Sequence, residues 1–255
     1  MQLINNKKFD IMKKSLFIIV LILTGFAFVN MSSCKRDPKP DPDDPIPPVV
    51  WYSPEPGPGG TLPESILPDT LTTAVTEYFT TYSGENPPVF DGQFVSHPHI
   101  LIHSTNPSDT PGTQFNDRYI AFFANNGLID FYGKQWDDNY DEYYEEVYRR
   151  LHVIGTGEGF CCYYLTEAYP NGMYAKQSTV FSGKWNASYG GLKDFQVAVI
   201  LLETSGNPNL AAPGSYRVLG DGDGLAQDTA WMAKSSFEKA PIMTDEEMFS
   251  MFRVK

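Results

Sequence analysis

The chain has 255 residues and a formal net charge of −12, with 20% charged and 14% aromatic residues. A chain this acidic repels the phosphates of nucleic acids and anionic lipid headgroups, so we expect it to bind neither through its charge. Only three cysteines are present, and no Cys-x-x-Cys pair offers a zinc or redox site.

Residues 1–33 have the pattern of a secretory signal peptide. Lys13 and Lys14 precede about 14 mostly apolar residues, which are too few for a spanning helix and have the wrong flanks. Met12 is a better start for this signal than Met1, because the two lysines then form its charged n-region. The segment carries four lysines and one aspartate, a net charge of +3, so its removal leaves a mature chain of net charge −15.

The last residues of this segment, Met31-Ser32-Ser33, lead directly into Cys34. Together they resemble the lipobox of bacterial lipoproteins, although Met31 stands where leucine is usual. The resemblance implies that Cys34 becomes the mature N-terminus and carries acyl chains such as palmitate, which hold the protein on a membrane. An ordinary cleaved signal that happens to contain a cysteine is the alternative.

Residues 34–68 are predicted to form a tether. Eleven prolines fall within residues 35–68, and proline fixes φ and removes hydrogen-bond donors, so an extended spacer is expected. Residues 49–52, Val-Val-Trp-Tyr, interrupt the spacer with an apolar patch that should dock on the folded domain or on a partner. The aspartates soon after Cys34 loosely resemble the signal for surface export of Bacteroidetes lipoproteins. We therefore expect a lipid-anchored protein of the outer membrane, with surface display favoured over a position facing the periplasm.

Residues 69–255 are predicted to form a single globular domain that is all-β or β-rich. Short strands joined by turns rich in glycine, proline and asparagine indicate an antiparallel β-sandwich or barrel. Residues 125–127, Asn-Asn-Gly, favour a tight hairpin. The predicted strands are 93–104, 118–124, 128–132, 159–168, 173–183, 195–203 and 215–219. Residues 195–203 are apolar on both faces, which is typical of a strand in the middle of a layered structure.

Three segments show helical patterns. Residues 69–82 begin with a capping aspartate and repeat apolar residues at helical spacing, which predicts a short N-terminal helix. Residues 137–152 have tyrosines, valine and leucine at helical spacing and charges that suit the helix dipole, so a helix is favoured over a strand there. Residues 244–252 start with a capping box and predict a helical turn or two at the C-terminus.

Adjacent cysteines occur at Cys161 and Cys162. A disulfide between neighbours in sequence would close a strained ring. We therefore expect both thiols to be reduced, small and apolar, on opposite faces of a strand.

Three of the four histidines, His97, His99 and His103, lie in one predicted strand and share a face. A His-x-His pair on a strand can direct two imidazoles at one metal ion, as in zinc sites with three nitrogen ligands. A half-exposed strand that uses histidine on its polar face explains the same pattern more simply. A metal ion is thus the one cofactor that the sequence suggests, and the simpler explanation of the histidine pattern requires no cofactor.

Aromatic rings and carboxylates are mixed between Trp136 and residue 146. Sugars stack on rings and hydrogen-bond to carboxylates, so Trp136, Tyr140, Tyr143 and Trp185 are candidates for a ligand-binding ring platform. An amphipathic element with its rings in the core is the alternative.

The sequence leaves three functions open. No catalytic motif is evident, so a non-catalytic, monomeric module that binds glycan or another extracellular ligand is preferred over an enzyme. A metal-dependent enzyme using His97, His99 and His103 is the second hypothesis. The third is a structural or assembly protein whose partner is another envelope protein.

Overall fold

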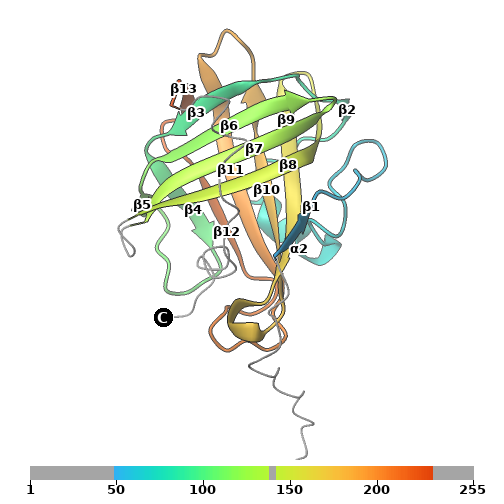
Figure 1. Cartoon of the computed structure of the whole chain (residues 1–255), viewed down its shortest axis with the longest axis vertical. Coiled ribbons are helices and arrows are strands. Elements are labelled where there is room, and N and C mark those ends of the chain that lie inside the picture. The colour runs from blue at the N-terminus through green and yellow to red at the C-terminus, as the bar shows by residue number, and fades with distance from the viewer. Residues whose placement is uncertain (1–48, 138–141, 232–255) are drawn as a thin grey trace, which may run out of the picture. The chain divides into compact units, whose positions relative to one another are not determined.

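The computed structural model describes residues 49–137 and 142–231 (Figure 1). These residues form thirteen strands, one α-helix, α2 (Asp69–Thr76), and one 3-10 turn, η2 (Pro170–Gly172). The predicted β-rich class is confirmed. Within the described part of the chain, no helix has both the length and the apolar composition needed to cross a membrane.

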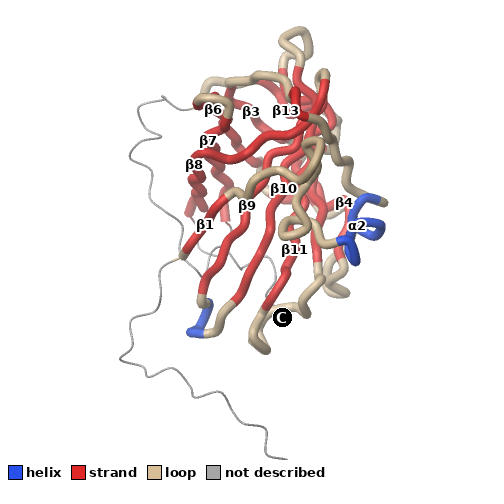
Figure 2. Tube along the Cα trace, turned by 90° about the vertical axis from the view of Figure 1, so that its right-hand side faces the viewer, coloured by secondary structure: helices blue, strands red, loops and turns tan. Residues whose placement is uncertain are grey.

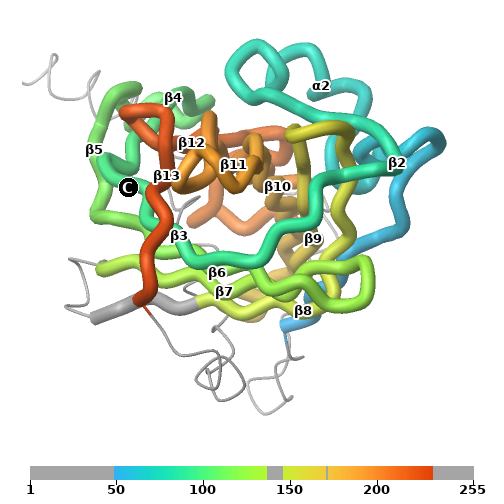
Figure 3. Tube along the Cα trace, turned by 90° about the horizontal axis from the view of Figure 1, so that it is seen from above, coloured from blue at the N-terminus to red at the C-terminus, as the bar shows by residue number. Residues whose placement is uncertain are grey.

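Eight strands form a closed antiparallel ring, shown from above in Figure 3. In ring order they are β3 (Gly92–Ser96), β6 (Arg118–Asn125), β7 (Leu128–Asp137), β8 (Glu142–Thr156), β9 (Gly159–Ala168), β10 (Ala175–Trp185), β11 (Gly191–Glu203) and β13 (Leu225–Asp228). Because β13 pairs back to β3, the ring has no free first or last strand. Of the two architectures predicted, the chain therefore adopts the barrel, which protects sheet edges by closure.

Three long segments of the meander are each divided into two strands. The additional strands are β4 (His99–Ser104), β5 (Gln114–Phe115) and β12 (Tyr216–Asp221). β12 pairs with the part of β11 that β13 leaves uncovered, β4 pairs with β12, and β5 pairs with β4. β3 and β4 therefore continue one another along the barrel, as do β5 and β6, and β12 and β13. The result is an up-and-down path of eight long segments.

The strand β1 (Val50–Tyr52) lies where two ring strands separate, and Figure 2 shows it alongside β9. The ladder between β8 and β9 ends at the pair His152 and Tyr163, after which each strand pairs with its other neighbour. β1 occupies the exposed edge of β9 from this point. The Ser53 hydroxyl then bridges the two strands, donating to Tyr163 O at 2.7 Å and accepting from His152 N at 2.9 Å.

The apolar patch at residues 49–52 thus docks on the chain's own domain, the first of the two predicted alternatives. The folded unit includes residues before the predicted boundary at Asp69, namely β1 and the turn from Gly57 to Thr61. A short strand, β2 (Glu85–Asn86), follows α2 and pairs in parallel with the end of β8.

Buried side chains form one cluster inside the barrel and two outside it. The inner cluster includes Phe94, Phe122, Phe131, Phe181 and Phe195. On the outer face of β8 to β12, α2 and the segment before it cover a second cluster that contains Val75, Val180 and Ile200. A smaller cluster on β6 to β8 is covered by Trp231. A strand such as β11 is therefore buried on both faces, which confirms the expectation for residues 195–203.

Several local predictions are confirmed. The predicted N-terminal helix is α2, although it ends at Thr76. The hairpin between β6 and β7 turns at Asn126 and Gly127, with φ of 50° and 82°, the positive values that a two-residue turn of this type requires. Cys161 and Cys162 are reduced, buried and on opposite faces of β9, one in the outer cluster and one in the inner.

The helix predicted over residues 137–152 is wrong from residue 142 onward, where the chain forms β8. Its valines, isoleucine and tyrosines favour strands, and pairing with both β7 and β9 outweighs the helical spacing. The alternation of inward and outward side chains along β8 is interrupted near Arg150, where the pairing with β7 shifts register and φ is 59°. The interruption hides the strand pattern in the sequence. The predicted C-terminal helix at 244–252 lies outside the described residues.

Candidate ligand site inside the barrel

The interior of the barrel changes from apolar to polar along its strands. Near the start of β9 the inward side chains are aromatic, with the Phe90 and Phe160 ring centroids 4.4 Å apart and those of Phe131 and Phe181 also 4.4 Å apart. Toward the end of β9 they become polar. In register, the inward pairs of β9 and β10 run Cys162 with Phe181, Tyr164 with Thr179, and Thr166 with Gln177. We call these regions the aromatic part and the polar part.

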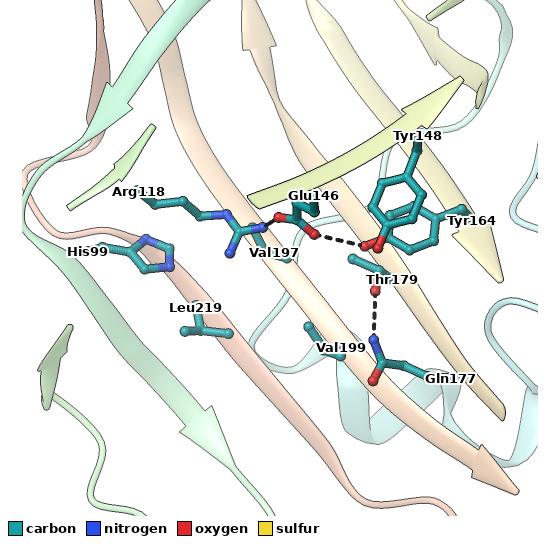
Figure 4. A pocket seen from close by; sticks show the side chains of 10 residues that line it. All are labelled: His99, Arg118, Glu146, Tyr148, Tyr164, Gln177, Thr179, Val197, Val199 and Leu219. Carbon is teal, nitrogen blue, oxygen red and sulfur yellow. Dashed lines mark hydrogen bonds and ion pairs between the residues drawn. The ribbon is translucent and has the colours of Figure 1, made fainter. Parts of the chain in front are cut away.

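A small enclosed cavity of about 10 Å³ lies in the polar part (Figure 4). That volume accommodates about one water molecule. Its polar lining comes from five strands and consists of His99, Arg118, Glu146, Gln177 and Thr179, together with the rings of Tyr148 and Tyr164. The remaining wall is apolar and is formed by Val197, Val199 and Leu219.

Arg118 and Glu146 form an ion pair in this wall, and each is only 3% exposed. The second carboxylate oxygen of Glu146 accepts a hydrogen bond from the Tyr164 hydroxyl at 3.4 Å. Gly133 on β7 makes room for the carboxylate, since a Cβ there would lie 2.5 Å from Glu146 Oε1. The two opposite charges compensate each other, which makes their burial tolerable. The pair therefore adds no net charge to the cavity.

His99 is completely buried, and its Nδ1 lies 3.1 Å from the Ser96 hydroxyl. Burial and the positive charge of Arg118 lower the pKa of His99 to about 3. The imidazole is therefore neutral at pH 7, and it retains one nitrogen that carries no proton.

Several buried polar atoms in the cavity lining lack a hydrogen-bond partner among the described residues, and His99 Nε2 and Gln177 Oε1 are two of them. Leaving a buried polar group unsatisfied costs about 1–3 kcal/mol, so such groups are rare unless water or a ligand completes them. Both side chains belong to the same small cavity, which makes this the strongest candidate for a binding site in the described part of the chain.

The structure separates the three histidines proposed as metal ligands. His97 is on the surface, with Nδ1 2.6 Å from Asp117 Oδ1, whereas His99 points into the barrel. His103 stacks on Tyr78 outside the barrel, with ring centroids 3.8 Å apart. One extra residue in β4 relative to β12, between Leu101 and His103, turns His103 to the other face. Within the described residues no group of three His, Cys, Asp or Glu is arranged to hold a metal ion.

The proposed ring platform is not assembled from the residues that the structure describes. Trp185 is part of the aromatic part, where its ring contacts Phe94 with centroids 5.7 Å apart. Trp136 lies toward the opposite end of the barrel, near the end of β7 and opposite Tyr143 in register. Tyr140 and the side chain of Tyr143 are outside the described residues.

Sequence reasoning missed every residue of the polar cavity except His99. A signal was available at Arg118, because it alternates with Ile120 and Phe122 and thus places a charge on the core face of a strand. The helical interpretation of residues 137–152 concealed the same signal at Glu146.

Comparison with known proteins adds no family to this description. No protein-family model matches the chain, and neither the curated proteins nor the solved structures contain a match.

Proposed function

We propose that this protein is a lipid-anchored protein of the outer membrane that binds a small molecule inside its barrel and does not catalyse its conversion. The observation that carries the proposal is the pair of buried, unpartnered polar atoms, His99 Nε2 and Gln177 Oε1, in the lining of one cavity. Barrels of eight strands are just wide enough either to be filled by side chains or to hold one small ligand. Here the aromatic part is filled, and the polar part has unmet hydrogen-bonding capacity.

The chemistry of the interior favours binding over catalysis. Arg118 and Glu146 neutralise each other, and His99, with a pKa of about 3, is a weak base at neutral pH. Burial raises the pKa of the Cys162 thiol well above its ordinary value, so the thiolate nucleophile is scarce. The proposal therefore places the ligand inside the barrel, on residues other than the ring platform expected from the sequence.

The anchoring part of the proposal is supported by the signal peptide, the lipobox-like residues before Cys34 and the proline-rich spacer. Growth of cells with radiolabelled palmitate should label the wild type, whereas the Cys34→Ala variant should stay unlabelled and leave the membrane fraction. An unlabelled wild type would contradict the anchor.

The binding part is tested with protein extracted from cell envelopes. Native mass spectrometry should show a small molecule on the wild type. Val199→Leu adds a methylene group at the cavity wall and should abolish the bound mass. Val180→Leu makes the same change in the outer cluster, so it should retain the ligand. A wild type without any bound small molecule would contradict the proposed function.

A further inference from the structure

The protonation state of His99 follows from its neighbours, and it decides what the cavity can bind. The Ser96 hydroxyl lies 3.1 Å from His99 Nδ1, and its interaction with the Asp221 carboxylate helps to lower the pKa of that group. Because a charged acceptor forms the stronger hydrogen bond, we assign the single Ser96 proton to Asp221, so that Ser96 accepts from His99 Nδ1. The proton of the neutral imidazole is therefore on Nδ1, and the unpartnered Nε2 is a hydrogen-bond acceptor.

Gln177 presents a second acceptor. Its amide nitrogen donates to Thr179 Oγ1 at 3.3 Å, which leaves the carbonyl oxygen Oε1 without a partner. Gln177 is only 4% exposed, so bulk water does not satisfy this oxygen. In Figure 4 the two acceptors lie toward opposite ends of the lining, with Val199 between them. A complementary ligand thus donates hydrogen bonds from two places and has carbon atoms in between.

The charges in the wall select against ions. An anion would bring only acceptors to these two acceptors, and the positive charge of Arg118 is already compensated by Glu146. A cation could donate, but it would be buried beside the guanidinium of Arg118. Burying an uncompensated charge costs far more than burying a neutral hydroxyl that finds a partner.

We propose that the cavity binds an uncharged, hydroxyl-bearing small molecule, such as a short diol or polyol, through donation to His99 Nε2 and Gln177 Oε1. This inference rests on the proposed function and specifies the ligand class for the same site. Because about 10 Å³ leaves room for only about one water molecule, a larger molecule must displace lining side chains, which limits affinity for short fragments.

The test uses the full mature chain in detergent and follows the His99 and Gln177 side-chain resonances by NMR. Propane-1,2-diol and glycerol are the probes, with sodium acetate and methylammonium chloride at equal concentration. We expect saturable shifts with the diol and the triol only. His99 should show a protonated Nδ1 and an unprotonated Nε2 before any probe is added.

Two variants and one control make the outcome specific. Gln177→Leu and His99→Phe each remove one acceptor and should weaken diol binding at least tenfold. His103→Phe makes the same histidine substitution on the outer face and should bind as the wild type does. Thermal melting identifies a variant that fails to fold, in which case the other variant decides.

The possible failures are distinguishable. Saturation by acetate or methylammonium but not by the diols, or an Nε2 that carries the proton, would overturn the ligand class and leave the proposed function standing. Equal diol binding by wild type and both cavity variants would also overturn it. Absence of any probe binding overturns the ligand class, and only an envelope-extracted wild type without a bound small molecule overturns the function.

Discussion

The aromatic and polar parts of the barrel share the inward faces of β6, β9, β10 and β11, yet they differ in how well their polar groups are satisfied. In the aromatic part, rings from different strands fill the space between them, as Phe131 and Phe181 do. In the polar part, one ion pair is compensated while His99 and Gln177 each leave an acceptor unpartnered. Packing therefore stabilises one part, whereas the other keeps groups that cost stability, which is the usual mark of a functional site.

The largest effect is expected from removing rings in the aromatic part. Phe181→Ala should lower the free energy of unfolding by about 3–5 kcal/mol, because a fully buried ring leaves a cavity that the barrel cannot close. Adding Phe131→Ala should destabilise the protein further, since it removes a second buried ring and eliminates no uncompensated charge or unpaired polar group. Urea unfolding followed by circular dichroism measures both, and a double variant more stable than Phe181→Ala would contradict the packing account.

The polar part should behave in the opposite way when its ion pair is removed. Glu146→Gln leaves Arg118 as a buried, uncompensated charge and should cost about 3–5 kcal/mol. Combining it with Arg118→Met removes that charge and should recover most of the loss. The same unfolding measurement applies, and a double variant no more stable than Glu146→Gln would show that the pair is not the source of the cost.

The sequence predicts the barrel better than it predicts the site. Alternation and turn residues located most ring strands, and β9 was placed at its observed bounds, because local propensity and inward packing agree there. The polar cavity depends on which strands become neighbours, and single-strand patterns do not contain that information. Gly133 illustrates this, since its missing side chain leaves room for the carboxylate of Glu146 on the neighbouring strand. The separation of His99 from His103 depends on one extra residue relative to β12, which only pairing reveals.

The buried histidine should make the polar part sensitive to acid. The folded-state pKa of His99 is about 3, below the value of about 6.5 expected for an unfolded chain. Between these values only the unfolded state binds the proton, so stability falls as pH decreases, by about 1.4 kcal/mol per pH unit. At pH 5 the loss relative to pH 6.5 is about 2 kcal/mol.

His99→Phe should remove this slope and leave the carboxylate titrations common to both proteins. Urea unfolding of wild type and variant between pH 7 and pH 4.5 gives the difference. His97 is present in both proteins, so its effect on stability cancels in the difference. That effect has the opposite sign, because the hydrogen bond to Asp117 raises the pKa of His97. Parallel stability curves for the two proteins would contradict a neutral, buried His99.

The smallest expected change in stability concerns β1, which lies over the polar part. β1 is held to β9 by three residue pairs, and its contacts with β8 include the Ser53 bridge and the edge of the Trp51 ring on Tyr148, with centroids 5.5 Å apart. Since Tyr148 lines the cavity, we expect opening of this seam to give access to the cavity. Trp51→Ala should cost about 1–2 kcal/mol, as Trp51 is only partly buried.

The informative readout of Trp51→Ala is local opening rather than global stability. Cys162 points into the barrel, and burial raises its pKa, so its alkylation requires opening. In a Cys161→Ala background, Trp51→Ala should increase Cys162 alkylation, located by peptide mass mapping, at least tenfold. Tyr52→Ala is the matched control, because Tyr52 is adjacent in β1 but exposed. If both variants alkylate equally fast, or if the rate follows global unfolding, β1 is ordinary packing, and the ligand must reach the cavity by another route.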